Sequence, residues 1–179
     1  QASRLSSKGD GGHGTGVAWD RAAVAASSVG ARTVHPSSIR LNRAIAAKNN
    51  ARVILSFCEA RLCEFSATNV ATALHRLAIS EGDSLSSSVD ICFVGLVATV
   101  ARQLSAFDTR ELANTPWAFS RLLFVDLPLL YAISAQSLAR IQDFRPQSLA
   151  NTVWSLAAMV VFDRHLLAAI ASHSIQIIQ

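Results

Sequence analysis

Side chains that could carry catalysis are few and scattered in this chain. The five histidines are far apart, no Gly-x-Ser-x-Gly sequence occurs, and no pair of carboxylates lies together on an apolar segment. The run from Gly9 to Gly14 has the spacing of a dinucleotide-binding loop, but no β-rich run precedes it and no Lys-Ser/Thr follows. We therefore expect no enzyme, no nucleotide site and no cofactor.

The three cysteines do not form a metal site by their spacing. Their separations match no zinc pattern, and Cys58 and Cys63 are five residues apart. On a helix, five residues turn two side chains about 140° away from each other, which prevents joint ligation. We expect Cys58, Cys63 and Cys92 to be reduced residues of the core, with no bound metal.

Composition places the chain among folded proteins. Of its 179 residues, 51% are hydrophobic and 16% are charged, which excludes disorder over the whole length. Its longest apolar runs, such as 127–139, are shorter than the roughly 18 residues that a membrane helix needs. We therefore expect no membrane span.

The basic charge is concentrated near the N-terminus. The net charge is +4, and residues 1–40 carry three of these four positive charges. Residues 1–37 are also rich in Gly and Ser and poor in acidic residues, which is typical of organelle transit peptides. A flexible linker and a tail held by a partner are the alternatives for this segment.

Three internal segments align without gaps. Phe65–Leu77, Phe107–Phe119 and Phe144–Leu156 share the pattern Phe-x4-[Val/Leu]-Ala-[Thr/Asn]-[Ala/Thr]-x-[His/Trp]-x-[Leu/Phe], and their phenylalanines are 42 and 37 residues apart. Each segment predicts a helix entered at Ser66, Asp108 or Arg145, and Asp108 with Glu111 resembles a capping box. Preceding helices are expected over 52–62, 89–104 and 127–141, with a seventh over 163–178. Pro116 is expected to kink its helix.

These helices are apolar on more than one side. Leu149, Val153 and Leu156 form one stripe of the third segment, and Ala150, Trp154 and Ala157 form another. Such helices are expected to be buried between neighbours on both sides. The prediction is an all-α fold, an α-solenoid of stacked helical hairpins with repeats of about 38 residues.

The predicted repeat domain covers residues 38–179. Its units are about 38–80, 88–124, 126–161 and a partial unit 163–179, which has a first helix without its second. We expect the chain to be part of a longer protein, or a neighbour to cover this helix.

The run Phe144–Ala157, with Leu149-Ala-Asn-Thr-Val-Trp154 at its centre, resembles the signature of octotricopeptide repeats. Phe107–Phe119 is similar to the same signature, and 41–43 with Phe65–Leu77 resembles the first repeat of such proteins in protists, which often end in a RAP domain. The resemblance implies an imported organelle protein that binds RNA and acts in its processing, stability or translation, or in an organellar ribosome. A mitochondrion is expected, with a chloroplast as the alternative. A scaffold that binds protein subunits without reading RNA is the alternative function.

Candidate RNA contacts follow from the aligned segments. Residues that differ between repeats on one exposed face are expected to read bases, and the candidates are Asn69, Glu111 and Ser148, together with Arg76, Ala118 and Ser155. Phosphate contacts are expected from arginines near the hairpin junctions, for which simple surface positions are the alternative: Arg43, Arg52, Arg61, Arg76, Arg102, Arg110, Arg140 and Arg145.

Two ladders of similar residues remain. One comprises Thr72, Asn114 and Asn151, and the other comprises His75, Trp117 and Trp154. They could form a platform for bases, but we favour packing between repeats, with the amides bonded to each other or to backbone.

Overall fold

The computed structural model describes residues 35–80 and 91–178. Predictions on residues 1–34 lie outside the described residues, among them the leader and the glycine run. The start of the second predicted unit, at 88–90, lies outside them as well.

The described residues form helices and turns, without a strand, so the all-α prediction is confirmed for them. Three short 3-10 helices each precede one of the aligned segments: η1 (Leu62–Glu64), η2 (Leu104–Ala106) and η3 (Ile141–Asp143). The α-helices are α1 (Pro36–Ala46), α2 (Ala51–Arg61), α3 (Ala67–Ile79), α4 (Ile91–Gln103), α5 (Thr109–Arg121), α6 (Leu127–Ala139), α7 (Pro146–Ala158) and α8 (Arg164–Ile178).

Local capping signals determine where the helices of the aligned segments begin. Ser66, Asp108 and Arg145 are the N-cap residues of α3, α5 and α7, as predicted. The capping box of α5 is complete: the Glu111 N–H donates to Asp108 Oδ1 and the Asp108 N–H donates to Glu111 Oε2, both at 2.8 Å. Sequence analysis did not predict α1 as a separate helix, although it starts with Pro36 as α7 starts with Pro146.

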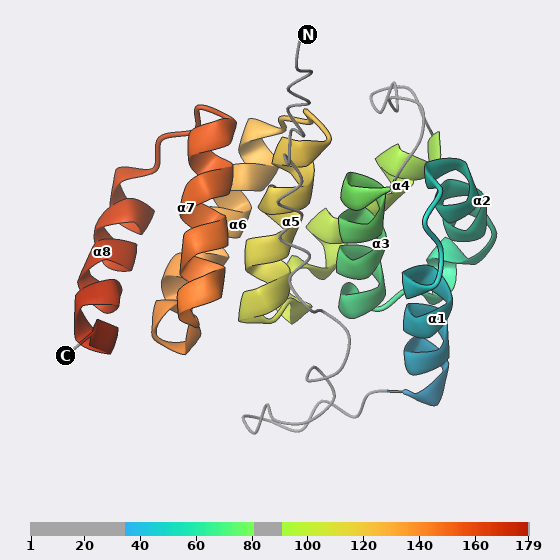
Figure 1. The fold of residues 1–179 in the computed structure, drawn as a ribbon, viewed down its shortest axis with the longest axis horizontal. Helices are drawn as coiled ribbons and strands as arrows, with labels where there is room; N and C mark the ends of the chain where they lie inside the picture. Colours follow the sequence, from blue (N-terminus) through green and yellow to red (C-terminus); the bar gives the residue numbers. More distant parts are fainter. Residues whose placement is uncertain (1–34, 81–90, 179) are drawn as a thin grey trace, which may run out of the picture. The chain divides into compact units, whose positions relative to one another are not determined.

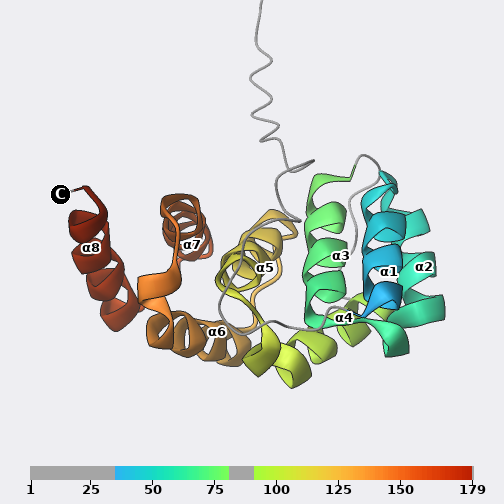
Figure 2. The ribbon, with the colours of Figure 1, turned by 90° about the horizontal axis from the view of Figure 1, so that it is seen from below.

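The helices of residues 35–80 and 91–178 lie in two layers, with α8 beside α7 at one end (Figures 1 and 2). α1, α3, α5 and α7 lie side by side, each packed against the next, and form what we call the odd layer. α2 and α4 pack together on one side of it, and α6 lies farther along the same side, against α5 and α8. We call α2, α4, α6 and α8 the even layer; α8 also packs against α7.

An equivalent phenylalanine joins the layers in each aligned segment. Phe65, Phe107 and Phe144 are buried, and each precedes the N-cap of an odd-layer helix. Their carbonyl oxygens accept hydrogen bonds from the next even-layer helix or its end: Gln103 Nε2 donates to Phe65 at 2.9 Å, and an Arg140 N–H donates to Phe107. The Phe144 carbonyl lies 3.3 Å from Nε2 of His173 in α8. The same backbone atom therefore serves three times as the link between consecutive helix pairs.

Burial on both sides holds for α5 but not for α7. Leu112 and Ala113, on different sides of α5, are both fully buried. In α7, Leu149 is buried, whereas Ala150 and Trp154 are exposed. The prediction of two-sided burial is therefore wrong for α7, because among the described residues α5 has odd-layer neighbours on both sides and α7 has one.

Pro116 lies inside α5, which is assigned as one helix from Thr109 to Arg121. Proline has no N–H, so the carbonyl of Leu112 cannot receive the usual helical bond from residue 116. The Pro116 side chain is buried, so its ring contributes to the packing of the odd layer.

Candidate functional site

Five of the six residues expected to read bases are buried, among them Ala118 and Ser155, which are both 0% exposed. Asn69 is 0% exposed, Glu111 is 2% exposed and Ser148 is 8% exposed. Each of these last three is the third residue of its helix, directly after the turn that the N-cap residue begins. The prediction of an exposed face is wrong for these five residues.

Two of these residues are bonded to the preceding odd-layer helix. Asn69 Nδ2 donates to the Ser38 carbonyl at 2.9 Å, and Asn69 Oδ1 accepts from the Ser38 hydroxyl at 3.0 Å. Glu111 Oε1 accepts from the Thr68 hydroxyl at 2.5 Å while its other oxygen caps α5. The residue type at this position varies between repeats, but its side chain has a structural role. The capping pattern was the sequence signal for that role.

Most of the predicted arginines outside α1, α5 and α7 are held by neighbouring groups. Arg61 pairs with Glu64 and lowers the pKa of that exposed carboxyl by hydrogen bonding. Arg102 Nη2 donates to the Thr99 hydroxyl at 2.8 Å, and Arg140 donates to the Phe107 carbonyl. In α3, Arg76 donates twice to the Lys48 carbonyl, at 2.6 and 2.9 Å. Arg52 is exposed near the start of α2.

The guanidinium groups of the other predicted arginines have no partner among the described residues. Arg43 in α1, Arg110 in α5 and Arg145 at the start of α7 form no ion pair or side-chain hydrogen bond with the described residues. Arg40 and Arg121 are exposed on α1 and α5 in the same way. Sequence analysis did not select Arg40 and Arg121. Both lie on exposed turns of helices, which marks them as surface cations.

The two ladders of similar residues contain contacts between helices. Asn151 Nδ2 donates to Asn114 Oδ1 at 3.4 Å, and the rings of His75 and Trp117 stack with centroids 5.1 Å apart and planes at 27°. Burial lowers the pKa of His75 to about 4, helped by the nearby charge of Arg76. These contacts agree with the packing interpretation, but Trp154 is 49% exposed.

The cysteines divide into a buried pair and an exposed residue. Cys58 in α2 and Cys92 in α4 are buried, as predicted, whereas Cys63 is exposed. The core prediction is wrong for Cys63 because the chain leaves α2 and turns through η1 at that point. A hydrogen bond with Cys92 and burial raise the pKa of the Cys58 thiol well above its usual value. Among residues 35–80 and 91–178, no cluster of His, Cys, Asp or Glu is suited to a metal ion.

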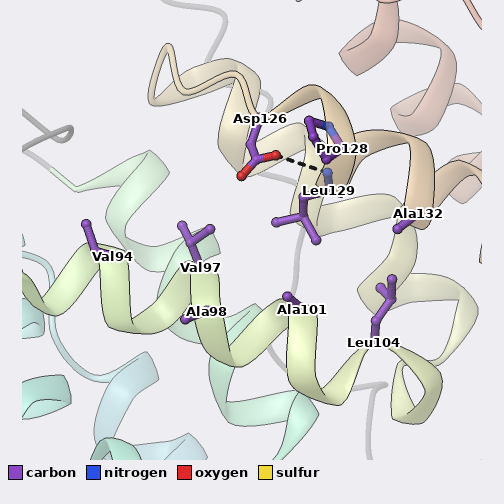
Figure 3. A pocket seen from close by; sticks show the side chains of 9 residues that line it. All are labelled: Val94, Val97, Ala98, Ala101, Leu104, Asp126, Pro128, Leu129 and Ala132. Carbon is purple, nitrogen blue, oxygen red and sulfur yellow. Dashed lines mark hydrogen bonds between the residues drawn. The ribbon is translucent and has the colours of Figure 1, made fainter.

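An apolar hollow lies between α4 and α6 (Figure 3). Its volume is about 490 Å³, and its walls are almost entirely aliphatic. Asp126 is at the rim, but its carboxylate accepts the Leu129 N–H at 3.0 Å and so caps α6. The hollow offers surface for burial and no free group for acid or base chemistry. The lining residues are Val94, Val97, Ala98, Ala101, Leu104, Asp126, Pro128, Leu129 and Ala132.

No protein-family model matches the chain, and no curated protein is similar to it in sequence. Within the part of the chain that the structure describes, no helix has both the length and the hydropathy needed to cross a bilayer. The function is therefore argued from the helices and from the groups on their surface.

Proposed function

We propose that this chain is an α-solenoid of repeats of about 38 residues and that it binds single-stranded RNA in an organelle. Its two helical layers and the recurring Phe carbonyl links support the repeat architecture. The resemblance to octotricopeptide repeats supports the RNA ligand. The chain would act in RNA processing, stability or translation, or as a component of an organellar ribosome.

The observation that carries the RNA proposal is a set of odd-layer arginines whose guanidinium groups have no partner among the described residues. Arg43, Arg110 and Arg145 form no ion pair or side-chain hydrogen bond with the described residues. Arg76 in α3 is bonded, as are Arg61 at the end of α2 and Arg140 after α6. A guanidinium without a protein partner can form two hydrogen bonds to a phosphate. RNA would therefore follow the odd layer and contact it mainly through phosphates, because five of the six candidate base-reading residues are buried.

The test compares two charge-matched triple variants. Arg110→Gln/Arg121→Gln/Arg145→Gln removes three cations of the odd layer, and the control Arg61→Gln/Arg102→Gln/Arg164→Gln removes three of the even layer. Binding of a fluorescent single-stranded RNA is measured by anisotropy over a salt series. Each lost phosphate contact reduces the slope of log K against log salt by about 0.7, so the odd-layer variant is expected to lose about two units of slope.

The control variant should keep a slope near that of the unaltered chain. Equal losses in both variants would contradict the assignment of RNA to the odd layer. Absence of binding by the unaltered chain at low salt would contradict the RNA proposal itself.

A protein-binding scaffold is the second candidate function, and a specific observation favours it. Val153 and Trp154 of α7 are 37% and 49% exposed, and the hollow between α4 and α6 is open and apolar. Surfaces of this kind are typical of protein contacts. Salt-independent association with protein subunits, combined with no RNA affinity, would identify the scaffold.

We propose a mitochondrial location, with the chloroplast as the alternative. The support is the basic, Gly- and Ser-rich composition of residues 1–37 together with the family resemblance. Import of a fluorescent protein carrying this segment into isolated mitochondria or chloroplasts distinguishes the two compartments. Import into neither would remove this support.

A further inference from the structure

One side of α7 is apolar, uncharged and open to solvent. Ala150, Val153, Trp154 and Ala157 are exposed there, and we call these four residues the open face of α7. The whole helix, Pro146–Ala158, contains no Asp, Glu, Lys or Arg. A neutral face of small, branched and aromatic side chains is suited to another apolar helix and is poorly suited to phosphate.

The same positions are covered in the two preceding helices of the odd layer. The equivalents of Ala150 are Ala113 in α5 and Ala71 in α3, which are 0% and 6% exposed. The equivalents of Val153, Pro116 and Leu74, are buried as well. α3 and α5 each have a following odd-layer helix packed against them, which are α5 and α7 respectively. Among the described residues α7 has no such follower, and this accounts for its open face.

The even layer is more open at the same end. Leu167 and Ala171 of α8 align with Leu130 and Ser134 of α6, each 37 residues earlier. Leu130 is 1% exposed and Ser134 is 2% exposed, whereas Leu167 is partly exposed and Ala171 is exposed. A partner that covers both α7 and α8 would therefore be a pair of helices.

We propose that the open face of α7 binds a further helix pair of this same repeat, which packs on α7 and α8 as α7 and α8 pack on α5 and α6. The first helix of the pair packs against α7 in the same way as α7 packs against α5. In that register it presents an uncharged surface to Val153 and Trp154. A polar side chain of the incoming helix bonds to the Asn151 amide, as Asn151 bonds to Asn114 at 3.4 Å.

The experiment supplies such a pair in the correct register. Ile178-Gln179 aligns with Ile141-Gln142, so a copy of residues 143–178 attached after Gln179 continues the spacing between α6 and α7. Cysteines replace Ala150 or Ala157 of the original α7, in a Cys63→Ser background that removes the exposed thiol. Maleimide labelling rates are compared between the 179-residue chain and the extended chain, and circular dichroism reports whether the added segment is helical.

Ala158→Cys is the matched control. Ala158 is exposed, but its equivalent in α5 is Arg121, which remains exposed although α7 covers α5. The extension is expected to slow labelling of Ala150→Cys and Ala157→Cys by about tenfold or more and to leave Ala158→Cys unchanged. It is also expected to raise the melting temperature of the chain.

Three results would overturn the proposal. The first is unchanged labelling of Ala150→Cys and Ala157→Cys when the added segment is helical. The second is an added segment that stays unfolded, because the open face would then fail to bind it. The third is protection that already occurs in the 179-residue chain and grows with its concentration, because the occupant would then be a second copy of this chain. None of these readouts involves RNA, so the proposed function can fail or hold separately.

Discussion

At the scale of single residues, burial separates structural side chains from candidate ligands of RNA. Asn69 and Glu111 vary between aligned segments, yet both are buried and bonded to a neighbouring helix. Variation alone therefore does not indicate recognition of bases. Free surface cations such as Arg110 and Arg145 are the better candidates, because no neighbouring group among the described residues competes for their hydrogen bonds.

His75 gives the protein a predicted sensitivity to acid. Its pKa is about 4 in the folded chain and 6.5 in its ordinary state, so between these values the unfolded chain binds more protons. The stability that neutral His75 contributes is complete above pH 6.5 and is lost as the pH falls toward 4. A shift of this size corresponds to a loss of up to about 3 kcal/mol.

The variant His75→Phe tests this origin of the sensitivity. Phenylalanine keeps a ring against Trp117 but does not titrate. Urea unfolding at pH 7 and pH 4.5 should show a smaller acid loss in His75→Phe than in the unaltered chain. His165→Gln replaces an exposed histidine and serves as the control. Equal acid losses in His75→Phe and the unaltered chain would contradict the prediction.

At the scale of helices, the N-terminal turn of α5 links two members of the odd layer. Glu111 accepts the Asp108 N–H and the Thr68 hydroxyl, so one carboxylate caps α5 and joins it to α3. Glu111→Ala is expected to lower the free energy of unfolding by about 1 to 3 kcal/mol, since it removes both bonds at a buried position. Chemical denaturation provides the measurement, and Glu111→Gln should recover part of the loss.

Glu59→Ala, an exposed change on α2, is the control for that substitution. It should alter the unfolding free energy by about 0.5 kcal/mol or less. A Glu111→Ala protein with full stability and a changed base preference would contradict the structural role of Glu111.

Sequence patterns predicted the helices except α1, because the signals of those helices are local. The N-caps Ser66, Asp108 and Arg145 and the Asp108–Glu111 box each depend on residues within one turn. Burial depends instead on which helix arrives from elsewhere, and the patterns did not contain that information. Glu111 was for this reason expected on the surface and Trp154 in the core, and the structure shows the reverse. The exposed position of Cys63 depends similarly on the path of the chain through η1.

At the scale of the whole described region, each helix contacts few others. α1 packs mainly on α3, α3 on α5, and α5 on α7, while α8 contacts α6 and α7. Stability in such an arrangement is approximately a sum of the stability of each helix pair and its contacts with neighbouring pairs. A central substitution should therefore affect more of the protein than an equally buried substitution in α8.

Leu112→Ala and Leu166→Ala make this comparison with matched residues. Leu112 in α5 is 0% exposed and Leu166 in α8 is 1% exposed, so each truncation is expected to cost about 2 to 5 kcal/mol locally. Hydrogen exchange followed by mass spectrometry should show faster exchange from α3 to α7 in Leu112→Ala. In Leu166→Ala the faster exchange should be confined to α8 and the helices that it touches, α6 and α7. Equal acceleration in α1 and α8 of the Leu166→Ala protein would mean that all the helices unfold as one cooperative unit. The open face of α7 would then be the edge of a single compact core, and the additive description of helix pairs would not apply.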